Sequence, residues 1–393
     1  MRPHADPIVL ANIDHTNRQI VRTTFGNQRK ILLSSNSAWN LANFRKPVIE
    51  ALVAAGYKVV AAAPADGNEG ALTGMGASFR PIRMSSTGTS PLEDLRLLRD
   101  YHKLITAERP AFFLGFTAKP NIYGSLAARL AGVPGVATIS GLGSAFFHGG
   151  LMGRLLLGLY RLALGKARAV MFQNPTDRAL FIDARIIRAA QARLVAGSGI
   201  DLDRFAATDL PRGDTFRFLL IARLLLDKGI AEFVDAARIV GQRHPAARFQ
   251  ILGGSGGDNP SAVPQADLAR WAAESIVEVL GACDDVRPYI AAADCVVLPS
   301  YREGLPRSLL EGAAMARPLI ATDVPGCRDV IEDGVTGMLC GAHSASALAE
   351  AMERMLELTP HQLAAMGAAG RRKVEAEFDQ RLVAEAYLAE LAR

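Results

Sequence analysis

Short apolar runs rich in β-branched residues alternate with longer amphipathic segments along most of the chain, and this alternation restricts the fold more than any other feature. The first series of apolar runs comprises Lys30–Ser34, Lys58–Ala63, Ala111–Gly115, Val136–Ile139 and Ala169–Gln173. Such short runs are typical of buried strands, and the segments between them are typical of helices. Strands that alternate with helices pair in parallel and carry helices on both faces of the sheet. The first half of the chain is therefore predicted to form a doubly wound, Rossmann-like α/β domain.

The alternation stops at a polar segment rich in turn-forming residues, Ala206–Thr215, and then starts again. The second series of apolar runs comprises Phe216–Ile221, Phe249–Leu252, Val277–Leu280, Cys295–Leu298 and Leu319–Ala321. A chain of 393 residues is too long for one ordinary core and suits two domains. We therefore expect two Rossmann-like domains, 30–207 and 208–393, that face each other across a cleft. Residues 1–29 are expected to be a flexible extension.

The composition is that of a soluble globular protein, with half of the residues apolar and about a fifth charged. All four cysteines fall in the second half and form no Cys-x-x-Cys pair, which argues against disulfides and a zinc site. Residues 1–30 lack the apolar core of a secretory signal, and no run of 18 apolar residues is present. These features favour a cytoplasmic location.

The charge is divided unevenly between the two predicted domains. Residues 1–207 carry 25 Lys and Arg against 13 Asp and Glu, whereas residues 208–393 carry 19 against 26. A basic first half is suited to an anionic surface or substrate. The basic residues are dispersed and no nucleic-acid-binding module is recognisable, so an anionic membrane or a pyrophosphate-linked lipid is favoured over nucleic acid.

Two carboxylates frame the most informative stretch of the second domain. Glu303 follows the predicted strand Cys295–Leu298, in the loop where open α/β sheets bind ligands. Pro306 is expected near the start of the next helix, and Glu311 lies about two turns into it. The two carboxylates can therefore hold different parts of one extended ligand.

Cationic and backbone groups near these carboxylates predict a site for phosphates. The amides of Gly304 and Leu305 precede a helix N-terminus, which is a favourable position for an anion. Arg223 follows the first strand of the second domain, and Lys228 comes five residues later. Two cations at this position suit an anionic ligand.

The Glu-x7-Glu spacing of Glu303 and Glu311, together with Arg223 and Lys228-Gly229, resembles the motifs of the retaining family 4 glycosyltransferases, which have the GT-B fold. The resemblance extends over roughly residues 30–390. It implies that Glu303 contacts the transferred sugar and Glu311 the ribose of the nucleotide. It also implies that Arg223 and Lys228 neutralise the charge that builds up on the departing diphosphate. It also implies that the last helix crosses back to the first domain.

The resemblance also assigns the glycine-rich segment after Gln250–Leu252 to the donor pocket. Gly253 and Gly254 would border the nucleotide sugar, and Leu280 would lie beside the base. Glycines after a strand let the backbone approach a ligand closely. The base is not specified by the sequence, and uridine is the expectation that comes from the resemblance.

On the acceptor side, the loop Ser35–Asn43 and the following Phe44-Arg45 resemble the acceptor-binding loop of capsule and lipid-linked-oligosaccharide transferases. Trp39, Asn40 and Arg45 are the candidate residues there. Trp39 is equally compatible with stacking on a sugar and with packing on the core.

One position departs from the pattern of many family members, which place a histidine close to the transferred sugar. This chain has Ser140 and Gly141 there, a form found in the capsule and O-antigen subgroup. No protein base is therefore assigned. His148 is a further acceptor-side candidate, although a single loop histidine is more often a bystander.

Two other segments allow more than one interpretation. Asp201-Leu202-Asp203 resembles an Asp-x-Asp metal motif, but Asp201 is better placed as a turn or helix cap. Leu151–Arg168 is apolar with four cations, which suits an interfacial helix or, as we favour, a helix that covers the sheet and has an exposed basic edge.

These features together imply a retaining, metal-independent glycosyltransferase without a cofactor. It would use a nucleotide-sugar donor, with UDP expected, and a lipid-linked or polysaccharide acceptor at the cytoplasmic membrane face. The alternatives are a non-hydrolysing epimerase of UDP-sugars, for which no acid and base pair is found, and a catalytically silent nucleotide-binding scaffold, to which only Ser140 points.

Overall fold

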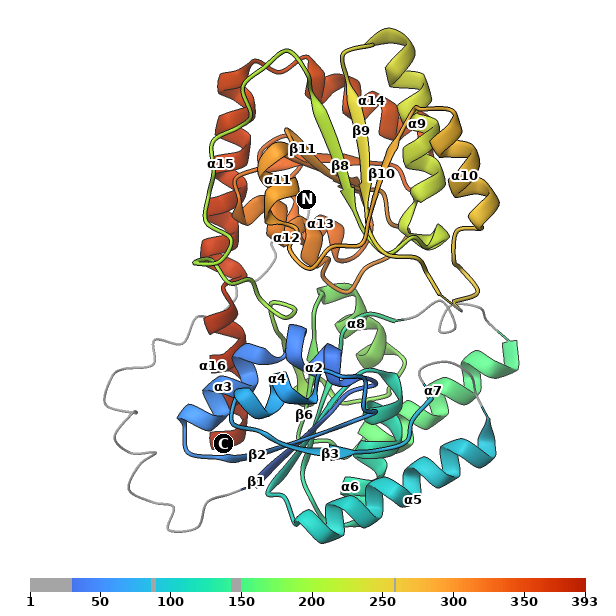
Figure 1. Cartoon of the computed structure of the whole chain (residues 1–393). Coiled ribbons are helices and arrows are strands. Elements are labelled where there is room, and N and C mark those ends of the chain that lie inside the picture. The colour runs from blue at the N-terminus through green and yellow to red at the C-terminus, as the bar shows by residue number, and fades with distance from the viewer. Residues whose placement is uncertain (1–29, 86–89, 143–149, 258) are drawn as a thin grey trace.

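The computed structural model describes residues 30–85, 90–142, 150–257 and 259–393 (Figure 1). They form two parallel sheets, one of seven strands in the order β3-β2-β1-β4-β5-β6-β7 and one of six in the order β10-β9-β8-β11-β12-β13. Each sheet has helices on both faces. The prediction of two doubly wound, Rossmann-like domains is confirmed.

The first sheet is built from strands whose side chains alternate between two apolar layers. Ile31 and Leu33 of one strand face α2, α3, α4 and α16, whereas Leu32 between them faces α5 and α6. The strands are β1 (Lys30–Ser34), β2 (Lys58–Ala63), β3 (Ser78–Pro81), β4 (Phe112–Phe116), β5 (Gly135–Ile139), β6 (Ala169–Phe172) and β7 (Ala192–Leu194). The helices are α2 (Ala38–Phe44), α3 (Lys46–Ala54), α4 (Glu69–Gly74), α5 (Pro91–Glu108), η1 (Pro120–Gly124), α6 (Ser125–Leu130), α7 (Gly150–Leu164), α8 (Pro175–Asp183) and η3 (Ala189–Gln191).

The second sheet follows the same plan. Val297 and Ile320 face the layer that contains α9 and α14, and Val296 and Leu319 face the layer that contains α12. Its strands are β8 (Arg217–Ile221), β9 (Arg248–Leu252), β10 (Glu278–Gly281), β11 (Cys295–Leu298), β12 (Leu319–Thr322) and β13 (Gly337–Cys340). Its helices are η4 (Leu226–Lys228), α9 (Ile230–Arg243), α10 (Gln265–Ala273), α11 (Arg287–Ala292), α12 (Arg307–Ala314), α13 (Cys327–Val330), α14 (Ala345–Leu356) and α15 (Pro360–Glu377).

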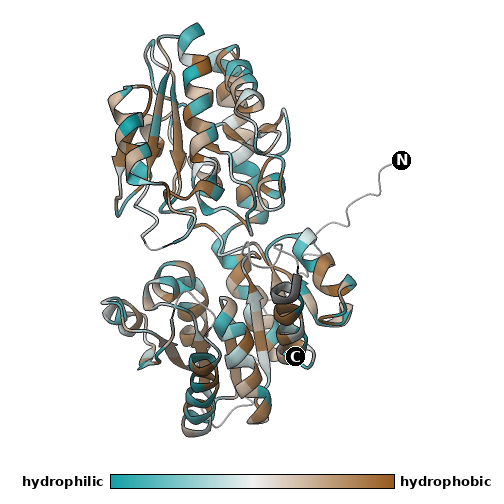
Figure 2. Cartoon of the chain, turned by 90° about the vertical axis from the view of Figure 1, so that its right-hand side faces the viewer, coloured by the Kyte–Doolittle hydropathy of each residue, from teal (hydrophilic) through white to brown (hydrophobic). Residues whose placement is uncertain are grey.

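Hydropathy follows this layered arrangement. Figure 2 shows hydrophobic stretches along the strands and a mixture of hydrophilic and hydrophobic residues along the surrounding helices. A helix that covers a sheet has this mixed character because only one side of it is buried. No helix within the described ranges is long and apolar enough to cross a membrane.

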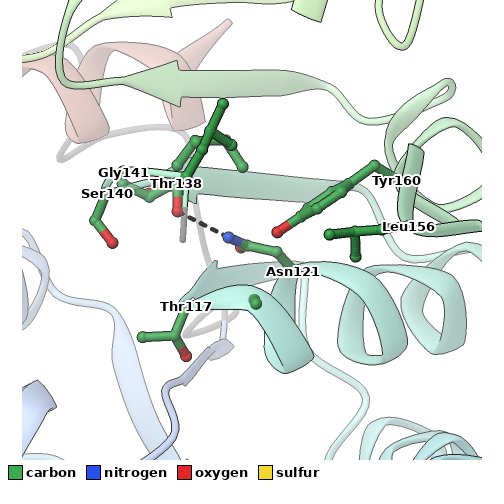
Figure 3. A pocket seen from close by; sticks show the side chains of 10 residues that line it. Thr117, Asn121, Thr138, Ser140, Gly141, Leu156 and Tyr160 are labelled. Carbon is green, nitrogen blue, oxygen red and sulfur yellow. Dashed lines mark hydrogen bonds between the residues drawn. The ribbon is translucent and has the colours of Figure 1, made fainter. Parts of the chain in front are cut away.

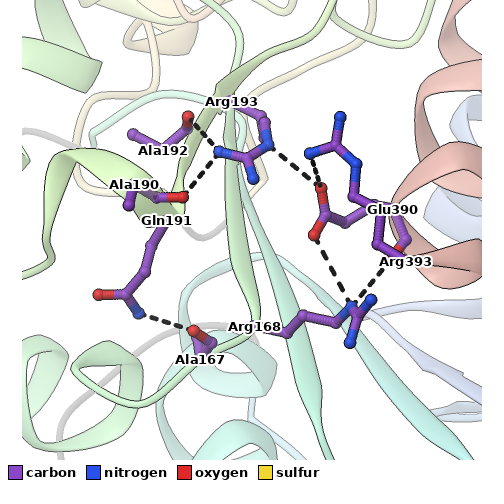
Figure 4. Close-up of polar contacts among 8 residues, drawn as sticks. All are labelled: Ala167, Arg168, Ala190, Gln191, Ala192, Arg193, Glu390 and Arg393. Atoms are coloured by element: carbon purple, nitrogen blue, oxygen red, sulfur yellow. Dashed lines mark hydrogen bonds and ion pairs between the residues drawn. The ribbon is translucent and has the colours of Figure 1, made fainter.

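The last helix, α16 (Gln380–Ala392), leaves the second domain and packs on the first, as expected (Figure 1). The hydroxyls of Tyr387 and Thr138 are 2.6 Å apart. The buried carboxylate of Glu390 lies among Arg168, Arg193 and Arg393 (Figure 4), with 3.1 Å between its Oε2 and the Nε of Arg193. The carboxyl end of the chain is therefore part of the first domain's core.

Several elements were not predicted. The strands β3 and β7 lie at the edges of the first sheet, and each is interrupted by an arginine, so they lack the apolar pattern on which the prediction relied. The strand β13 also lies at an edge, and it begins with a glycine. The segment 35–43 was expected to be a loop, but Ser37 caps the helix α2 by accepting a hydrogen bond from the amide of Asn40.

Candidate functional site

The predicted donor-binding residues come together at the carboxyl edge of the second sheet. Arg223 follows β8, Gly253 and Gly254 follow β9, Leu280 lies in β10, and Glu303 follows β11. These four strands are neighbours, in the order β10-β9-β8-β11. The carboxyl ends of parallel strands form the usual ligand-binding edge of such sheets.

Lys228 and Glu303 form an ion pair, with 2.5 Å between Nζ and Oε1. Gly229, next to the lysine, has a φ of +71°, and a Cβ built there would lie 2.1 Å from the carbonyl oxygen of Pro299. Only glycine fits this close approach. The contact between the two loops places the lysine beside the carboxylate.

Arg223 is exposed and makes no ion pair with any residue of the described ranges. It lies in the loop between β8 and η4, five residues before Lys228. An exposed cation and a paired cation thus lie within six residues of each other. Of the two predicted clamp residues, only Lys228 is in contact with a candidate carboxylate.

The glycine-rich segment is tied to the strands on both sides of it. The amide of Gly253 donates to the carbonyl of Gly281 over 2.8 Å, and the carbonyl of Gly254 accepts from the amide of Leu224 over 2.9 Å. A Cβ at Gly253 would lie 1.7 Å from the carbonyl oxygen of Ala222. The glycine therefore allows the loops after β8 and β9 to lie against each other.

Glu311 lies in α12 and is almost completely buried. Burial raises its pKa, because a carboxylate loses hydration, and the charge and hydrogen bond of Arg307 oppose that rise. The Nε of Arg307 donates to Oε1 of Glu311 over 2.8 Å. The predicted ribose-binding carboxylate is thus held by a guanidinium one helical turn earlier.

The loop that contains Glu303 also contacts the first domain. A Cβ at Gly304 would lie 2.1 Å from the carbonyl oxygen of Ser140, and Asn174 donates to the carbonyl of Gly304 over 2.9 Å. Ser140, an acceptor-side candidate, therefore lies directly beside the donor loop. The helix α12 begins at Arg307, one residue later than expected, with Pro306 as its N-cap.

Two further residues of this boundary were not among the predicted site residues. Asn174 caps α8, where its Oδ1 accepts from the amide of Asp177 over 2.8 Å. Asp177 is buried and pairs with Arg302, the residue before Glu303. The Asn-Pro sequence at 174–175 is a helix-start signal that identifies the cap, but not its contact with the other domain.

A small cavity of about 130 Å³ opens at the carboxyl ends of β4 and β5 (Figure 3). Its lining includes Thr117, Asn121, Ser140 and Tyr160. Thr117 has a φ of +101°, which is a strained conformation for a β-branched residue. Asn121 donates to the carbonyl of Thr138 over 2.8 Å, an interaction drawn in Figure 3. Strain and a cavity at this edge suggest a ligand-binding role.

The remaining acceptor-side candidates lie on or next to α2. Trp39 is 49% exposed and packs edge-on against Phe44, with 5.3 Å between the ring centroids. The Oδ1 of Asn40 accepts from the hydroxyl of Ser35 over 2.8 Å. Arg45 is buried against the ring of Phe116. His148 lies outside the described residues.

Asp201 is a turn cap, as predicted, since its Oδ1 accepts from the amides of Asp203 and Arg204. The helix α7 covers the first sheet with Tyr160 and Leu164 and exposes Arg161. The described residues contain no group of three or more His, Cys, Asp or Glu side chains that could hold a metal ion.

Two family models match this chain, one in each domain. Residues 30–174 match the model described as glycosyl transferase 4-like, and residues 215–358 match the model described as glycosyl transferases group 1. The second match includes Arg223, Lys228, Glu303 and Glu311. The roles of these four residues stay predictions.

Two named relatives of this chain are glycosyltransferases. The chain is 26% identical to the N,N'-diacetylbacillosaminyl-diphospho-undecaprenol alpha-1,3-N-acetylgalactosaminyltransferase of Campylobacter jejuni, over 90% of this chain and 96% of that protein. It is 21% identical to the capsular polysaccharide biosynthesis glycosyltransferase CapM of Staphylococcus aureus, over 74% and 79% of the two chains.

The structure of Anabaena HepE in complex with UDP and glucose has a similar fold. Its TM-score is 0.75 at 19% identity, with 93% of this chain and 99% of that chain covered. This chain therefore belongs to the glycosyltransferases of the GT-B fold that join a glycosyl transferase 4-like first domain to a group 1 second domain.

Proposed function

We propose that this glycosyltransferase moves a sugar from a UDP-sugar to a lipid-linked or polysaccharide acceptor, with retention of configuration, during cell-surface glycan synthesis. The contact between Lys228 and Glu303 beside Arg223 is the observation that carries the proposal. The two cations would suit the phosphates of a sugar diphosphate, and the carboxylate would suit the hydroxyls of its sugar. The names of the Campylobacter and Staphylococcus relatives support the class of acceptor.

In the proposed reaction, an acceptor hydroxyl oxygen forms a bond to C1 of the sugar while the bond between C1 and the diphosphate oxygen breaks. The departing diphosphate oxygen takes the proton of the acceptor hydroxyl on the same face. Arg223 and Lys228 neutralise the charge that develops on the diphosphate, and Glu303 accepts hydrogen bonds from sugar hydroxyls. Positioning and charge stabilisation therefore provide most of the rate enhancement.

The nucleotide is proposed to lie along the carboxyl edge of the second sheet. Glu311 accepts hydrogen bonds from the ribose hydroxyls, and the amides near Gly304 and Leu305 face the phosphates. Gly253 and Gly254 border the sugar, and Leu280 lies beside the base. Because two cations supply the positive charge, the proposed reaction uses neither a metal ion nor a cofactor.

We also propose that the enzyme binds peripherally to an anionic membrane through the outer face of α5, α6 and α7. These helices lie on one face of the first sheet. Five of their leucines are at least half exposed: Leu92, Leu95, Leu130, Leu155 and Leu162. Seven exposed cations accompany them: Arg96, Arg99, Lys103, Arg129, Arg154, Arg161 and Lys166. Exposed leucines with adjacent cations suit an interfacial surface that binds anionic lipids.

A panel of UDP-, GDP- and ADP-sugars tests the proposed donor. A true donor raises the melting temperature in proportion to its occupancy, and it is consumed when a lipid-linked acceptor is added. A UDP-sugar that both stabilises the protein and transfers its sugar is the expected result. Release of an epimerised UDP-sugar without acceptor would support an epimerase, and binding without turnover across the acceptor panel would support a silent scaffold.

Co-sedimentation with vesicles tests the membrane surface separately. Wild-type protein is expected to bind vesicles that contain phosphatidylglycerol and not vesicles of phosphatidylcholine alone. The double substitution Leu92→Ser and Leu95→Ser should weaken that binding. Val335→Ser, at an exposed site of the second domain, should leave it unchanged. Equal binding by all three proteins would contradict the assignment of the surface.

A further inference from the structure

Arg45 is a buried cation without a counterion. The residue is 3% exposed and lies at the junction of α2 and α3. Its Nε and Nη1 are buried and have no hydrogen-bond partner. Its guanidinium packs over the ring of Phe116, 4.6 Å from the centroid. Among the described residues its side chain pairs with no carboxylate, and an unpaired buried charge is costly.

Arg317 is a second buried arginine, and its Nε and Nη1 also have no hydrogen-bond partner. It is 0% exposed, and its Nη2 donates to the carbonyls of Thr208 and Asp209 over 3.0 and 2.7 Å. Burial lowers the pKa of Arg317, and the nearby Asp294 and Asp209 oppose that shift. Burial also lowers the pKa of Arg45, where Tyr387 opposes the shift and a second cation, Arg307, adds to it. Arg45 is thus the buried arginine whose surroundings lack a negative charge.

Arg45 does not line the cavity of Figure 3, but it contacts a residue next to that cavity. Phe116, under the guanidinium, ends β4, and the next residue, Thr117, lines the cavity of Figure 3. Tyr387, which interacts with Arg45, is paired with Thr138, another residue of that cavity. Arg45 therefore lies behind the carboxyl ends of the strands that carry the cavity.

A second guanidinium reaches the same region from the other domain. The Nη1 of Arg307 donates to the carbonyl of Asn43 over 2.7 Å, and its guanidinium lies 5.3 Å from the centroid of the Phe44 ring. Asn43 and Phe44 directly precede Arg45 in the chain. The two arginines therefore lie close to the same short segment at the domain boundary.

We propose that Arg45, assisted by Arg307, binds the phosphate or diphosphate ester group of the acceptor. A guanidinium presents paired N–H groups that match phosphate oxygens, and it stays charged in a desolvated site. The bound anion supplies the negative charge that no described side chain supplies to Arg45. This inference rests on the proposed lipid-linked acceptor. It extends that proposal, because it names the group of the acceptor that is recognised and the residue that binds it.

Arg307 also connects this anion site to the donor side. Its Nε holds Glu311, the predicted ribose-binding carboxylate, while its Nη1 contacts the first domain. Anion binding next to Arg307 would therefore bring the acceptor's diphosphate close to the nucleotide. The donor's own diphosphate is the other anion that could bind at this site. The experiment below distinguishes the acceptor's diphosphate from the donor's.

Arg45→Met tests the proposal, since methionine keeps much of the side-chain volume and removes the charge. The KM for a polyprenyl-diphosphate-linked sugar acceptor should rise about tenfold or more, as expected for loss of one charge-assisted contact. The KM for the donor and the affinity for UDP should stay unchanged. The melting temperature should stay the same or rise, because an unpaired buried charge is removed. The acceptor KM of Arg45→Lys should lie between that of wild type and that of Arg45→Met.

Arg317→Met is the matched control. It removes a buried arginine that is hydrogen-bonded, so it should lower the melting temperature and leave the acceptor KM unchanged. Calorimetry with inorganic pyrophosphate gives a second readout that needs no turnover. Wild-type protein should bind pyrophosphate, and Arg45→Met should bind it more weakly, even if the acceptor panel contains no substrate. This readout distinguishes failure of the anion site from failure of the proposed function.

Three results would overturn the inference. An unchanged acceptor KM together with unchanged pyrophosphate binding in Arg45→Met would remove the anion site. Loss of UDP affinity as large as the loss of acceptor affinity would assign Arg45 to the donor's diphosphate instead. A fall in melting temperature like that of Arg317→Met, without a change in acceptor KM, would make Arg45 a structural residue.

Discussion

Lys228 and Glu303 are 75 residues apart in the chain, yet the lysine Nζ lies 2.5 Å from the carboxylate Oε1. They belong to loops at the ends of the neighbouring strands β8 and β11. Each charged group is therefore held by the other. A sugar diphosphate presents hydroxyls to the carboxylate and phosphate oxygens to the lysine, so both groups remain paired when it binds.

Neutralising the predicted clamp should slow the reaction more than it weakens binding. Lys228→Met and Arg223→Met should each lower kcat by about 10²–10³, by analogy with the loss of one preorganised donor. The measurement is kcat at saturating donor and acceptor. Arg212→Met, in the exposed linker, is the control and should retain wild-type activity. If both clamp variants stay within about threefold of wild type, the cations have no part in the chemical step.

Glu303 and Glu311 should differ in which part of the donor they recognise. Glu303→Gln should reduce turnover of the UDP-sugar strongly and leave the affinity for free UDP nearly unchanged. Glu311→Gln should weaken binding of both ligands, because the ribose is common to them. Loss of a charge-assisted acceptor corresponds to roughly 1.5–3 kcal/mol in a desolvated site. Titration of both variants with UDP and with the intact donor separates the roles, and equal loss of UDP affinity would refute the assignment.

The buried environment of Glu311 predicts a pH dependence of donor affinity. Burial raises its pKa, so the protonated form persists to a higher pH than in an exposed glutamate. The ionised carboxylate is the better acceptor for ribose hydroxyls, so affinity for an intact UDP-sugar should fall as the pH falls through that raised pKa. Calorimetry between about pH 5 and 8 measures this. Glu311→Gln should show no such dependence, and a matching dependence in that variant would exclude Glu311 as its source.

The raised pKa of Glu311 also makes the free energy of unfolding depend on pH. The folded state binds the Glu311 proton more tightly than the unfolded state does. The contribution of this group to the free energy of unfolding therefore falls as the pH rises from the usual glutamate range through the raised pKa. The free energy of unfolding of wild type, measured with urea, should accordingly fall relative to that of Glu311→Gln as the pH rises through this range.

The sequence was sufficient to predict the layered fold and to assign Lys228 and Glu303 to loops after strands of the same sheet, because strand alternation determines which loops share a sheet edge. The ion pair between them was not predicted. It was not sufficient for α2, where the cap Ser37 and the buried Ala38, Leu41 and Ala42 lie in a stretch that looks like a polar loop. Contacts between the domains, such as that of Arg307 with Asn43, depend on how two separately folded units meet. Local sequence patterns do not contain that information.

Glu390 should be important for holding α16 on the first domain. Its buried carboxylate is shared by three arginines, so Glu390→Gln leaves them without a common anion (Figure 4). The expected loss is roughly 1–3 kcal/mol in the free energy of unfolding, measured with urea, because the arginines are partly exposed. Glu385→Gln, on the exposed side of the same helix, should change it little. A similar effect of both substitutions would show that the cluster does not anchor the helix.

The configuration of the new glycosidic bond is the most direct test of the proposed retaining reaction. The donor identified by the thermal panel is incubated with acceptor and wild-type enzyme, and the anomeric proton of the isolated product is examined by NMR. An α-linked UDP-sugar should give an α-linked product, because the departing diphosphate takes the acceptor proton on the face where the new bond forms. A β-linked product would contradict it, since inversion requires a base on the opposite face.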